Sequence, residues 1–104
     1  MMDLELDGRV AIVTGASRGL GRAAALALVE QGVRVVAAAR SIGDLDELMS
    51  TAPDQIHSIQ CDMLDAGAVA ALPEVAIERF GGLDIIVNNA GIAPAGKFLE
   101  QDAT

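Results

Sequence analysis

The 104-residue sequence contains no tyrosine and no tryptophan, and its only phenylalanines are Phe80 and Phe98. Its core must therefore be built from Val, Ile, Leu, Ala and Met. Cys61 is the single cysteine, which excludes an internal disulfide and favours a reducing compartment. Seven basic residues stand against fifteen acidic ones, for a net charge of −8. This balance argues against nucleic acid as a partner, because a phosphate backbone requires a basic face.

Long apolar runs are absent as well. No stretch of about 18 apolar residues is present, so the sequence predicts no membrane-spanning helix. The acidic beginning lacks the basic segment and apolar core of a signal peptide. We therefore expect a cytoplasmic protein. With 52% hydrophobic and 21% charged residues, the composition is globular, and the length fits one domain over residues 1–104.

Short apolar runs alternate with helical segments along the whole chain. Strands are expected at 10–14, 33–39, 56–61 and 84–88, and helices at 20–31, 44–50 and 66–80, with another helix beginning within 98–104. Pro73 lies inside the third helix and predicts a kink or a late start there. Alternation of this kind predicts parallel strands joined by right-handed crossovers. The expected fold class is α/β, a Rossmann-like doubly wound parallel sheet that is incomplete, with about four strands and three helices.

The turn after the first strand is rich in glycine: T-G-A-S-R-G-L-G at 14–21 places Gly15, Gly19 and Gly21 between a strand and a helix. Such a turn lets the backbone approach a pyrophosphate, and the helix start offers unpaired N–H groups to the anion. The spacing differs from G-x-G-x-x-G, and no G-K-[ST] follows, so the turn is not a P-loop. The alternative is a tight turn without a ligand.

The end of the second strand lacks the acid that normally binds the ribose hydroxyls of NAD, about 20 residues after the glycines. Arg40 stands there instead, within A-A-R-S at 38–41. A guanidinium without a neighbouring carboxylate favours the 2′-phosphate of NADP over NAD, and Arg18 could reach the same phosphate. The alternative is that Arg40 is a solvated loop residue. A methyltransferase-like domain is disfavoured, because it would require acids where Thr14 and Ala39 stand.

Two later strand ends carry polar residues. Asp62, followed by Met63, could accept a hydrogen bond from an adenine amino group, or could cap the following turn. After the fourth strand, N-N-A-G at 88–91 leaves room for a bulky ligand, although a plain turn is the alternative. Each signal alone is modest, whereas their order and spacing together are specific.

These motifs, together with C-D-M-L-D at 61–65, F-G at 80–81 and L-D-I-I-V-N-N-A-G at 83–91, resemble the short-chain dehydrogenase/reductase family in its main non-extended branch. The resemblance implies cofactor-binding roles for Gly15, Ser17, Arg18, Gly19, Leu20, Gly21, Arg40, Asp62, Met63, Asn89, Ala90 and Gly91. It implies that Thr14 and Asn88 tie strands to loops and that Asp84 is structural. It implies no metal site.

The implied activity is that of an NAD(P)-dependent oxidoreductase, which exchanges hydride between a nicotinamide and a small carbonyl or alcohol substrate. The family uses a tyrosine hydroxyl as proton relay, with a lysine four positions later that lowers its pKa. This chain has no tyrosine, and Lys97 is its only lysine, so no catalytic residue is assigned. We expect a truncated cofactor-binding N-terminal part, inactive alone and without the family's oligomer interfaces. The alternative function is a non-catalytic nucleotide-binding or protein-interaction module that uses the exposed edge of strand 84–88.

Overall fold

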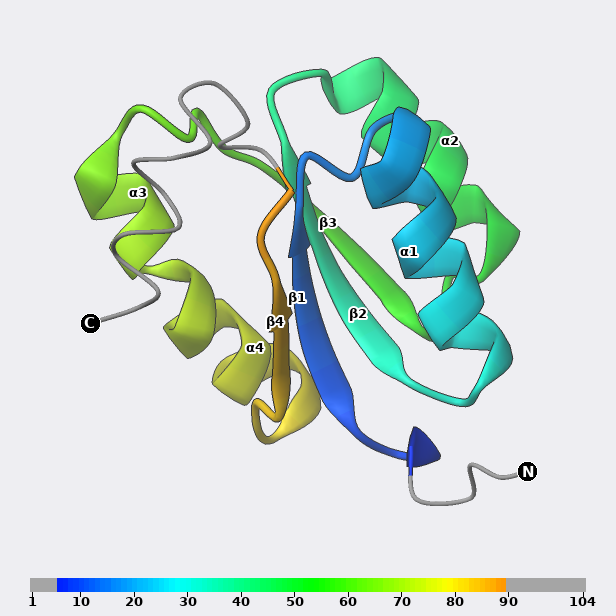
Figure 1. Cartoon of the computed structure of the whole chain (residues 1–104). Helices are drawn as coiled ribbons and strands as arrows, with labels where there is room; N and C mark the ends of the chain where they lie inside the picture. The colour runs from blue at the N-terminus through cyan, green and yellow to red at the C-terminus, as the bar shows by residue number, and fades with distance from the viewer. Residues whose placement is uncertain (1–5, 90–104) are drawn as a thin grey trace.

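A computed structural model of the chain describes residues 6–89 and confirms the predicted fold class. The strands β1 (Val10–Thr14), β2 (Arg34–Ala39), β3 (Ile56–Gln60) and β4 (Ile85–Val87) form one parallel sheet in the order β3-β2-β1-β4. The chain thus starts in the middle of the sheet, moves outward to β3, and returns to the other side of β1 (Figure 1). This reversal of direction beside β1 is the place where doubly wound sheets bind ligands.

Helices cover both faces of the sheet. The helices α1 (Gly19–Glu30) and α2 (Ile42–Thr51) lie on one face, and α3 (Ala66–Ala70) and α4 (Leu72–Phe80) lie on the other (Figure 1). Alanine and leucine give α1 a high helix propensity, and α4 ends at Gly81, whose φ of 88° is the left-handed conformation typical of a helix end.

Alternate residues of the central strands build two apolar layers. Every residue of β1 is buried, and so are the last five residues of β2. Val13 and Val35 pack under α1 and α2, whereas Ile12 and Val36 pack under α4 with Leu72. Strands covered on both faces must be apolar at every position, which is why β1 and β2 read as continuous apolar runs.

The third predicted helix is the main correction to the elements. Residues 66–80 form two helices rather than one, so the structure describes four helices in residues 6–89 instead of three. Asp65 caps α3 by accepting a hydrogen bond from the N–H of Ala68, and Pro73 lies in the first turn of α4. A proline has no N–H to donate, so a helix start is the position that it tolerates best. The expected kink or late start at Pro73 is thus found as a break at Ala71.

The other predicted bounds differ from the observed ones by at most two residues. The expected helix in 98–104 lies outside the described residues, as do Ala90 and Gly91. None of the helices in residues 6–89 has the length and apolar character needed to cross a bilayer.

Candidate functional site

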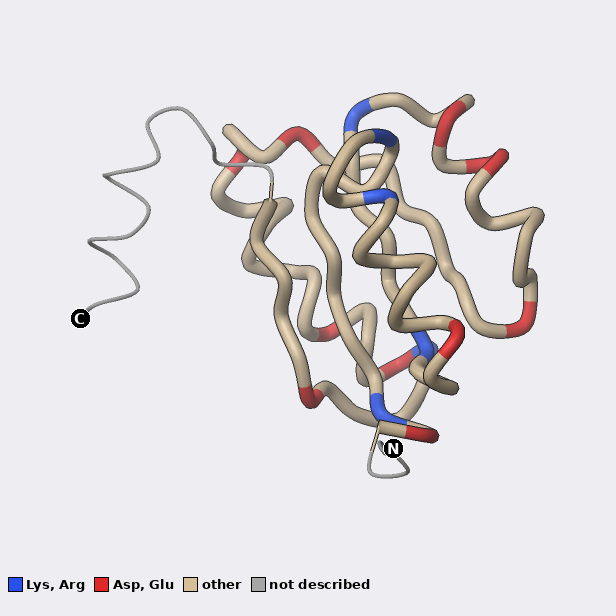
Figure 2. The backbone as a smooth tube through the Cα atoms, turned by 45° about the vertical axis from the view of Figure 1, so that its right-hand side comes forward, with Lys and Arg blue, Asp and Glu red and all other residues tan. Residues whose placement is uncertain are grey.

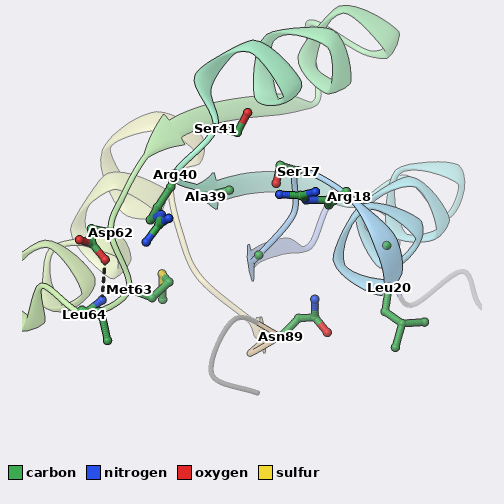
Figure 3. Close-up of a pocket in the computed structure, with 12 residues that line it drawn as sticks. Ser17, Arg18, Leu20, Ala39, Arg40, Ser41, Asp62, Met63, Leu64 and Asn89 are labelled. Atoms are coloured by element: carbon green, nitrogen blue, oxygen red, sulfur yellow. Dashed lines mark hydrogen bonds between the residues drawn. The ribbon is translucent and has the colours of Figure 1, made fainter. Parts of the chain in front are cut away.

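An open pocket of about 740 Å³ lies at the carboxyl edge of the sheet, beside the reversal of strand order. Its volume is within the range of about 300–1,000 Å³ that is usual for small-molecule sites. The turns after β1, β2, β3 and β4 all contribute to its lining (Figure 3). The lining residues are Gly15, Ser17, Arg18, Gly19, Leu20, Ala39, Arg40, Ser41, Asp62, Met63, Leu64 and Asn89.

The glycine-rich turn forms one wall of this pocket. Gly15 and Gly19 have φ angles of 62° and 63°, which residues with a side chain rarely adopt. The N–H of Ala16 donates to the carbonyl of Ala38 (3.2 Å), which holds the turn against the end of β2. Arg18, the N-cap residue of α1, offers no side-chain acceptor to the first N–H groups of the helix, and the first turn contains no acid. The start of α1 therefore presents free N–H groups and the positive end of the helix dipole to the pocket.

Gly21 differs from the other two glycines, because it is buried and does not line the pocket. A Cβ atom at Gly21 would clash with the carbonyl oxygen of Gly15 and lie 2.7 Å from its carbonyl carbon and 2.9 Å from Nδ2 of Asn89. The structural role of Gly21 is therefore close packing of α1 against the turn, beneath the surface that the pocket exposes.

Two arginines make the pocket positive. Arg18 comes from the glycine-rich turn and Arg40 from the end of β2, and in Figure 3 the side chain of Arg18 extends toward the side of the pocket that carries Arg40. Within residues 6–89 neither guanidinium pairs with a carboxylate, since the ion pairs there join Arg9 to Asp84 and Arg22 to Glu47. In Figure 2 basic positions lie at both ends of the molecule and acidic ones are spread over helices and loops, so the charge of the pocket depends on Arg18 and Arg40 themselves. An anion is the ligand that these charges favour.

Asp62 caps its own turn and still faces the pocket. Its Oδ1 accepts a hydrogen bond from the N–H of Leu64 (2.9 Å), while its Oδ2 has no hydrogen-bond partner in the described part of the chain. The sequence left a cap and a ligand contact as alternatives, and the geometry is compatible with both at once. Burial raises the pKa of the adjacent Cys61 thiol, and the charges of Asp65 and Asp62 raise it further. Cys61 is therefore held as a neutral thiol rather than as a nucleophile.

Thr14 connects the ends of β1 and β4. Its hydroxyl lies 3.4 Å from the carbonyl of Val87 and 3.4 Å from Oδ1 of Asn88, and it accepts a hydrogen bond from the N–H of Asn89 (2.9 Å). The expected tying role of Thr14 and Asn88 is thus present. These bonds place Asn89 at the rim of the pocket, between the glycine-rich turn and Met63 (Figure 3).

Three lining residues were missed by the sequence analysis: Ala39, Ser41 and Leu64. Ala39 and Ser41 flank Arg40 in the chain, so their place after a parallel strand was the available signal. Ser41 donates to Oδ2 of Asp44 (3.1 Å) at the start of α2. Leu64 is 88% exposed, and no sequence pattern distinguishes such a residue from any other loop leucine.

Comparison with known proteins places this geometry in a family. The sequence model of the short chain dehydrogenase family matches residues 9–104. Versicolorin reductase of Emericella nidulans is 48% identical over 96 residues, covering 88% of this chain and 36% of that protein. L-xylulose reductase of Mesocricetus auratus is 43% identical over 99 residues, covering 95% of this chain and 38% of that protein.

Solved structures agree with these relatives. A short chain dehydrogenase from Bacillus anthracis superimposes with a TM-score of 0.75 at 33% identity, over 82% of this chain and 36% of that one. A short chain dehydrogenase/reductase from Burkholderia phymatum in complex with NAD gives a TM-score of 0.75 at 31% identity, over 83% of this chain and 31% of that one. The chain belongs to the short-chain dehydrogenase/reductase family of nicotinamide-dependent oxidoreductases, and it spans 36% and 38% of the length of the two reductases named above.

Proposed function

We propose that the pocket binds NADP by its adenosine and pyrophosphate, and that residues 1–104 are the N-terminal dinucleotide-binding part of one Rossmann-fold oxidoreductase domain, located in the cytoplasm. The observation that carries the proposal is the presence of two positive side chains in one pocket: Arg18 and Arg40 both line it, and neither has a carboxylate partner in residues 6–89. No acid stands at the end of β2 to favour the free ribose hydroxyls of NAD. The 2′-phosphate of NADP would be a negatively charged partner for these two guanidinium groups.

The turn after β1 fits a pyrophosphate. Open space surrounds the position where Gly19 would carry a Cβ, so the backbone there is accessible to a ligand. The N–H groups at the start of α1 and the hydroxyl of Ser17 would hold the phosphate oxygens. We assign Gly15 and Gly19 to the close approach of the backbone, and Gly21 to the packing that keeps α1 in place.

The two ends of the pocket suit the two ends of the cofactor. Arg40, Asp62 and Met63 lie at one end, and Leu20 lies at the other (Figure 3). In our proposal Oδ2 of Asp62 accepts from the adenine amino group, Met63 contacts the ring, and Leu20 and Asn89 lead toward the nicotinamide. Ala90 and Gly91, outside the described residues, stay predicted contacts on the same path.

The bound nicotinamide would supply hydride exchange with a carbonyl or alcohol substrate, as the names of the two reductase relatives suggest. The chain itself has no tyrosine, and Lys97 is its only lysine. We therefore propose that these 104 residues grip and orient the adenosine half of the cofactor but do not move a proton. Mixing the chain with NADPH and carbonyl compounds should give no oxidation of NADPH, and measurable turnover would contradict this assignment.

A charge-removal experiment tests the cofactor preference. The ligands 2′,5′-ADP and 5′-AMP differ only in the 2′-phosphate, so the ratio of their dissociation constants measures the recognition of that group. Arg40→Ala should weaken the binding of 2′,5′-ADP roughly 10- to 100-fold, which corresponds to the loss of one charged hydrogen bond, and should leave the binding of 5′-AMP nearly unchanged. Arg34→Ala is the matched control, because Arg34 is an exposed arginine at the opposite end of β2.

The result is measured by calorimetric titration at two salt concentrations, since screening should weaken 2′,5′-ADP more than 5′-AMP. Equal losses for both ligands, or equal effects of the two variants, would contradict a 2′-phosphate contact by Arg40.

A second candidate function is a non-catalytic nucleotide-binding or interaction module. The observation in its favour is Ile86, which is 54% exposed on β4, a strand that pairs with only one neighbour among the described residues. An exposed apolar strand edge favours association with another chain. Both candidates predict NADPH binding, so concentration-dependent association of the chain in sedimentation is the result that would support this candidate over the first.

A further inference from the structure

The backbone around Arg40 is held from the neighbouring strand. The last bond of the ladder between β2 and β3 runs from the N–H of Cys61 to the carbonyl of Ala39 (2.8 Å). One residue further, the side chain of Gln60 continues it, because its Nε2 donates to the carbonyl of Arg40 (3.0 Å). Among the described residues this is the only side-chain hydrogen bond to the Arg40 backbone. The ladder is thereby extended by one residue beyond the end of β2.

The pleat of β3 explains why Gln60 can make this bond. Gln60 pairs with Ala39 in the sheet register and lies two residues after Ser58, so both side chains point to the same face. Ser58 lies under α2, with its hydroxyl 3.4 Å from the carbonyl of Leu45. Gln60 therefore points toward the segment that connects β2 to α2, which is the segment that carries Arg40.

We infer that Gln60 is a positioning residue for cofactor choice: by holding the Arg40 carbonyl, it fixes where the Arg40 guanidinium meets the 2′-phosphate. The inference rests on the proposed binding of NADP. Arg40 is exposed, and its side chain forms no ion pair with the described residues, so its backbone anchor is the main restraint on its position. On the α2 side the segment is already fixed by the N–H of Leu45, which donates to the carbonyl of Ser41 (3.1 Å). Gln60 supplies the anchor on the β3 side.

The test removes the donor and measures selectivity rather than affinity alone. Gln60→Met keeps the length of the side chain but cannot donate, and Gln60→Glu replaces the donor with a charged acceptor. In the 104-residue chain each variant should lower the preference for 2′,5′-ADP over 5′-AMP, by about three- to tenfold for Gln60→Met. The loss should be larger for Gln60→Glu, because its carboxylate repels both the Arg40 carbonyl and the 2′-phosphate.

Gln55→Met is the matched control. Gln55 directly precedes the other end of β3, where its Nε2 donates to the carbonyls of Val29 and Val33 (3.2 Å each). This variant removes hydrogen bonds of the same chemical kind far from the pocket. It should lower the denaturation midpoint in urea and leave the ratio of the two ligand affinities unchanged.

The outcomes separate the inference from the proposal beneath it. Native chain that does not prefer 2′,5′-ADP would overturn the proposed cofactor and this inference with it. Native preference that persists in Gln60→Met would overturn the inference alone. Equal weakening of both ligands in Gln60→Met would also overturn it, because a general loss of structure acts on both. Selective loss of 2′,5′-ADP binding, in a variant whose urea midpoint stays near that of the native chain, supports it.

Discussion

At the residue scale, the turn after β1 requires glycine for two different physical reasons. Gly15 and Gly19 are required by backbone conformation, since their φ angles of 62° and 63° disfavour a side chain. Gly21 is required by packing, because Gly15 and Asn89 occupy the space that a Cβ would need. The pocket therefore depends on a residue that does not line it.

Gly21→Ala should destabilise the protein. The added methyl group meets backbone atoms of Gly15, which cannot move aside like a flexible side chain, so we expect a loss of about 1–3 kcal/mol in the free energy of unfolding. Gly43→Ala is the matched control: Gly43 lies in α2 with no atom within 4 Å of its Cβ position, so its stability should be unchanged or slightly higher. Urea denaturation of both variants measures the difference, and equal midpoints would show that the turn can relax around a methyl group.

The spacing of the glycines could be read from the sequence, whereas the different structural roles of Gly15, Gly19 and Gly21 could not. A strand that ends at Thr14 and a helix that begins near Leu20 place the intervening residues at the carboxyl edge of a parallel sheet. The burial of Gly21 depends on how closely α1 approaches Gly15 and Asn89, two segments that are 74 residues apart in the chain. A local sequence pattern contains no information about how closely these two segments approach each other in space.

At the scale of elements, β4 is the shortest strand of the sheet, with three residues. Asp84 fastens its beginning to β1 by a reciprocal pair: its N–H donates to the carbonyl of Val10 (2.8 Å), and its Oδ2 accepts from the N–H of Val10 (3.0 Å). Thr14 fastens the other end through Asn89. Asp84 is thus structural, as the family resemblance implied, because its backbone and side chain together hold β4 against β1.

Asp84→Ala should weaken the junction of β1 and β4. The substitution removes the acceptor of the Val10 N–H, and Val10 is 4% exposed, so water cannot easily replace it. We expect a loss of about 1–3 kcal/mol in the free energy of unfolding. Asp84→Asn is the control, since its amide oxygen still accepts from Val10. Hydrogen exchange of the Val10 amide gives a local readout, and equal protection in the two variants would contradict this role of the carboxylate.

The break between α3 and α4 shows how far element prediction reaches. Pro73 predicted an interruption of the helix within residues 66–80, because proline lacks the N–H that a helix interior requires. The sequence alone left a kink and a late start as alternatives. In the structure a new helix starts at Leu72, with Pro73 in its first turn. This helix packs Leu72 and Ala76 against Ile12 and Val36 of the sheet.

At the scale of the whole molecule, the packing of α4 on the sheet affects how stability depends on pH. His57 lies on β3, where burial lowers the pKa of its imidazole and the charge of Arg79 on α4 lowers it further, below the ordinary value of 6.5. The folded state therefore favours the neutral ring. The contribution of His57 to stability is therefore fully present above its ordinary pKa of 6.5 and is lost as the pH falls through the lowered pKa, because the unfolded chain binds the proton more readily.

His57→Gln should remove this part of the pH dependence. Between pH 7.5 and 5.5, values chosen to bracket roughly the ordinary histidine pKa, the native chain should lose more stability than the variant. Carboxylates titrate in both proteins and cancel in the difference. Urea denaturation across this range provides the measurement, and parallel pH profiles for the two proteins would refute the assignment to His57.

The sequence by itself determined the alternation of strands and helices, the parallel sheet, and the set of strand ends that carry Arg18, Arg40, Asp62 and Asn89. Local apolar runs and turn residues encode these features, because each depends on a few neighbouring residues. Only the tertiary structure decided that Gly21 packs instead of lining the pocket, that Gln60 holds the Arg40 carbonyl, and that Ser41 and Leu64 join the site. Those features depend on distances between strands and helices, which are set by packing across the sheet and are not written in any one segment.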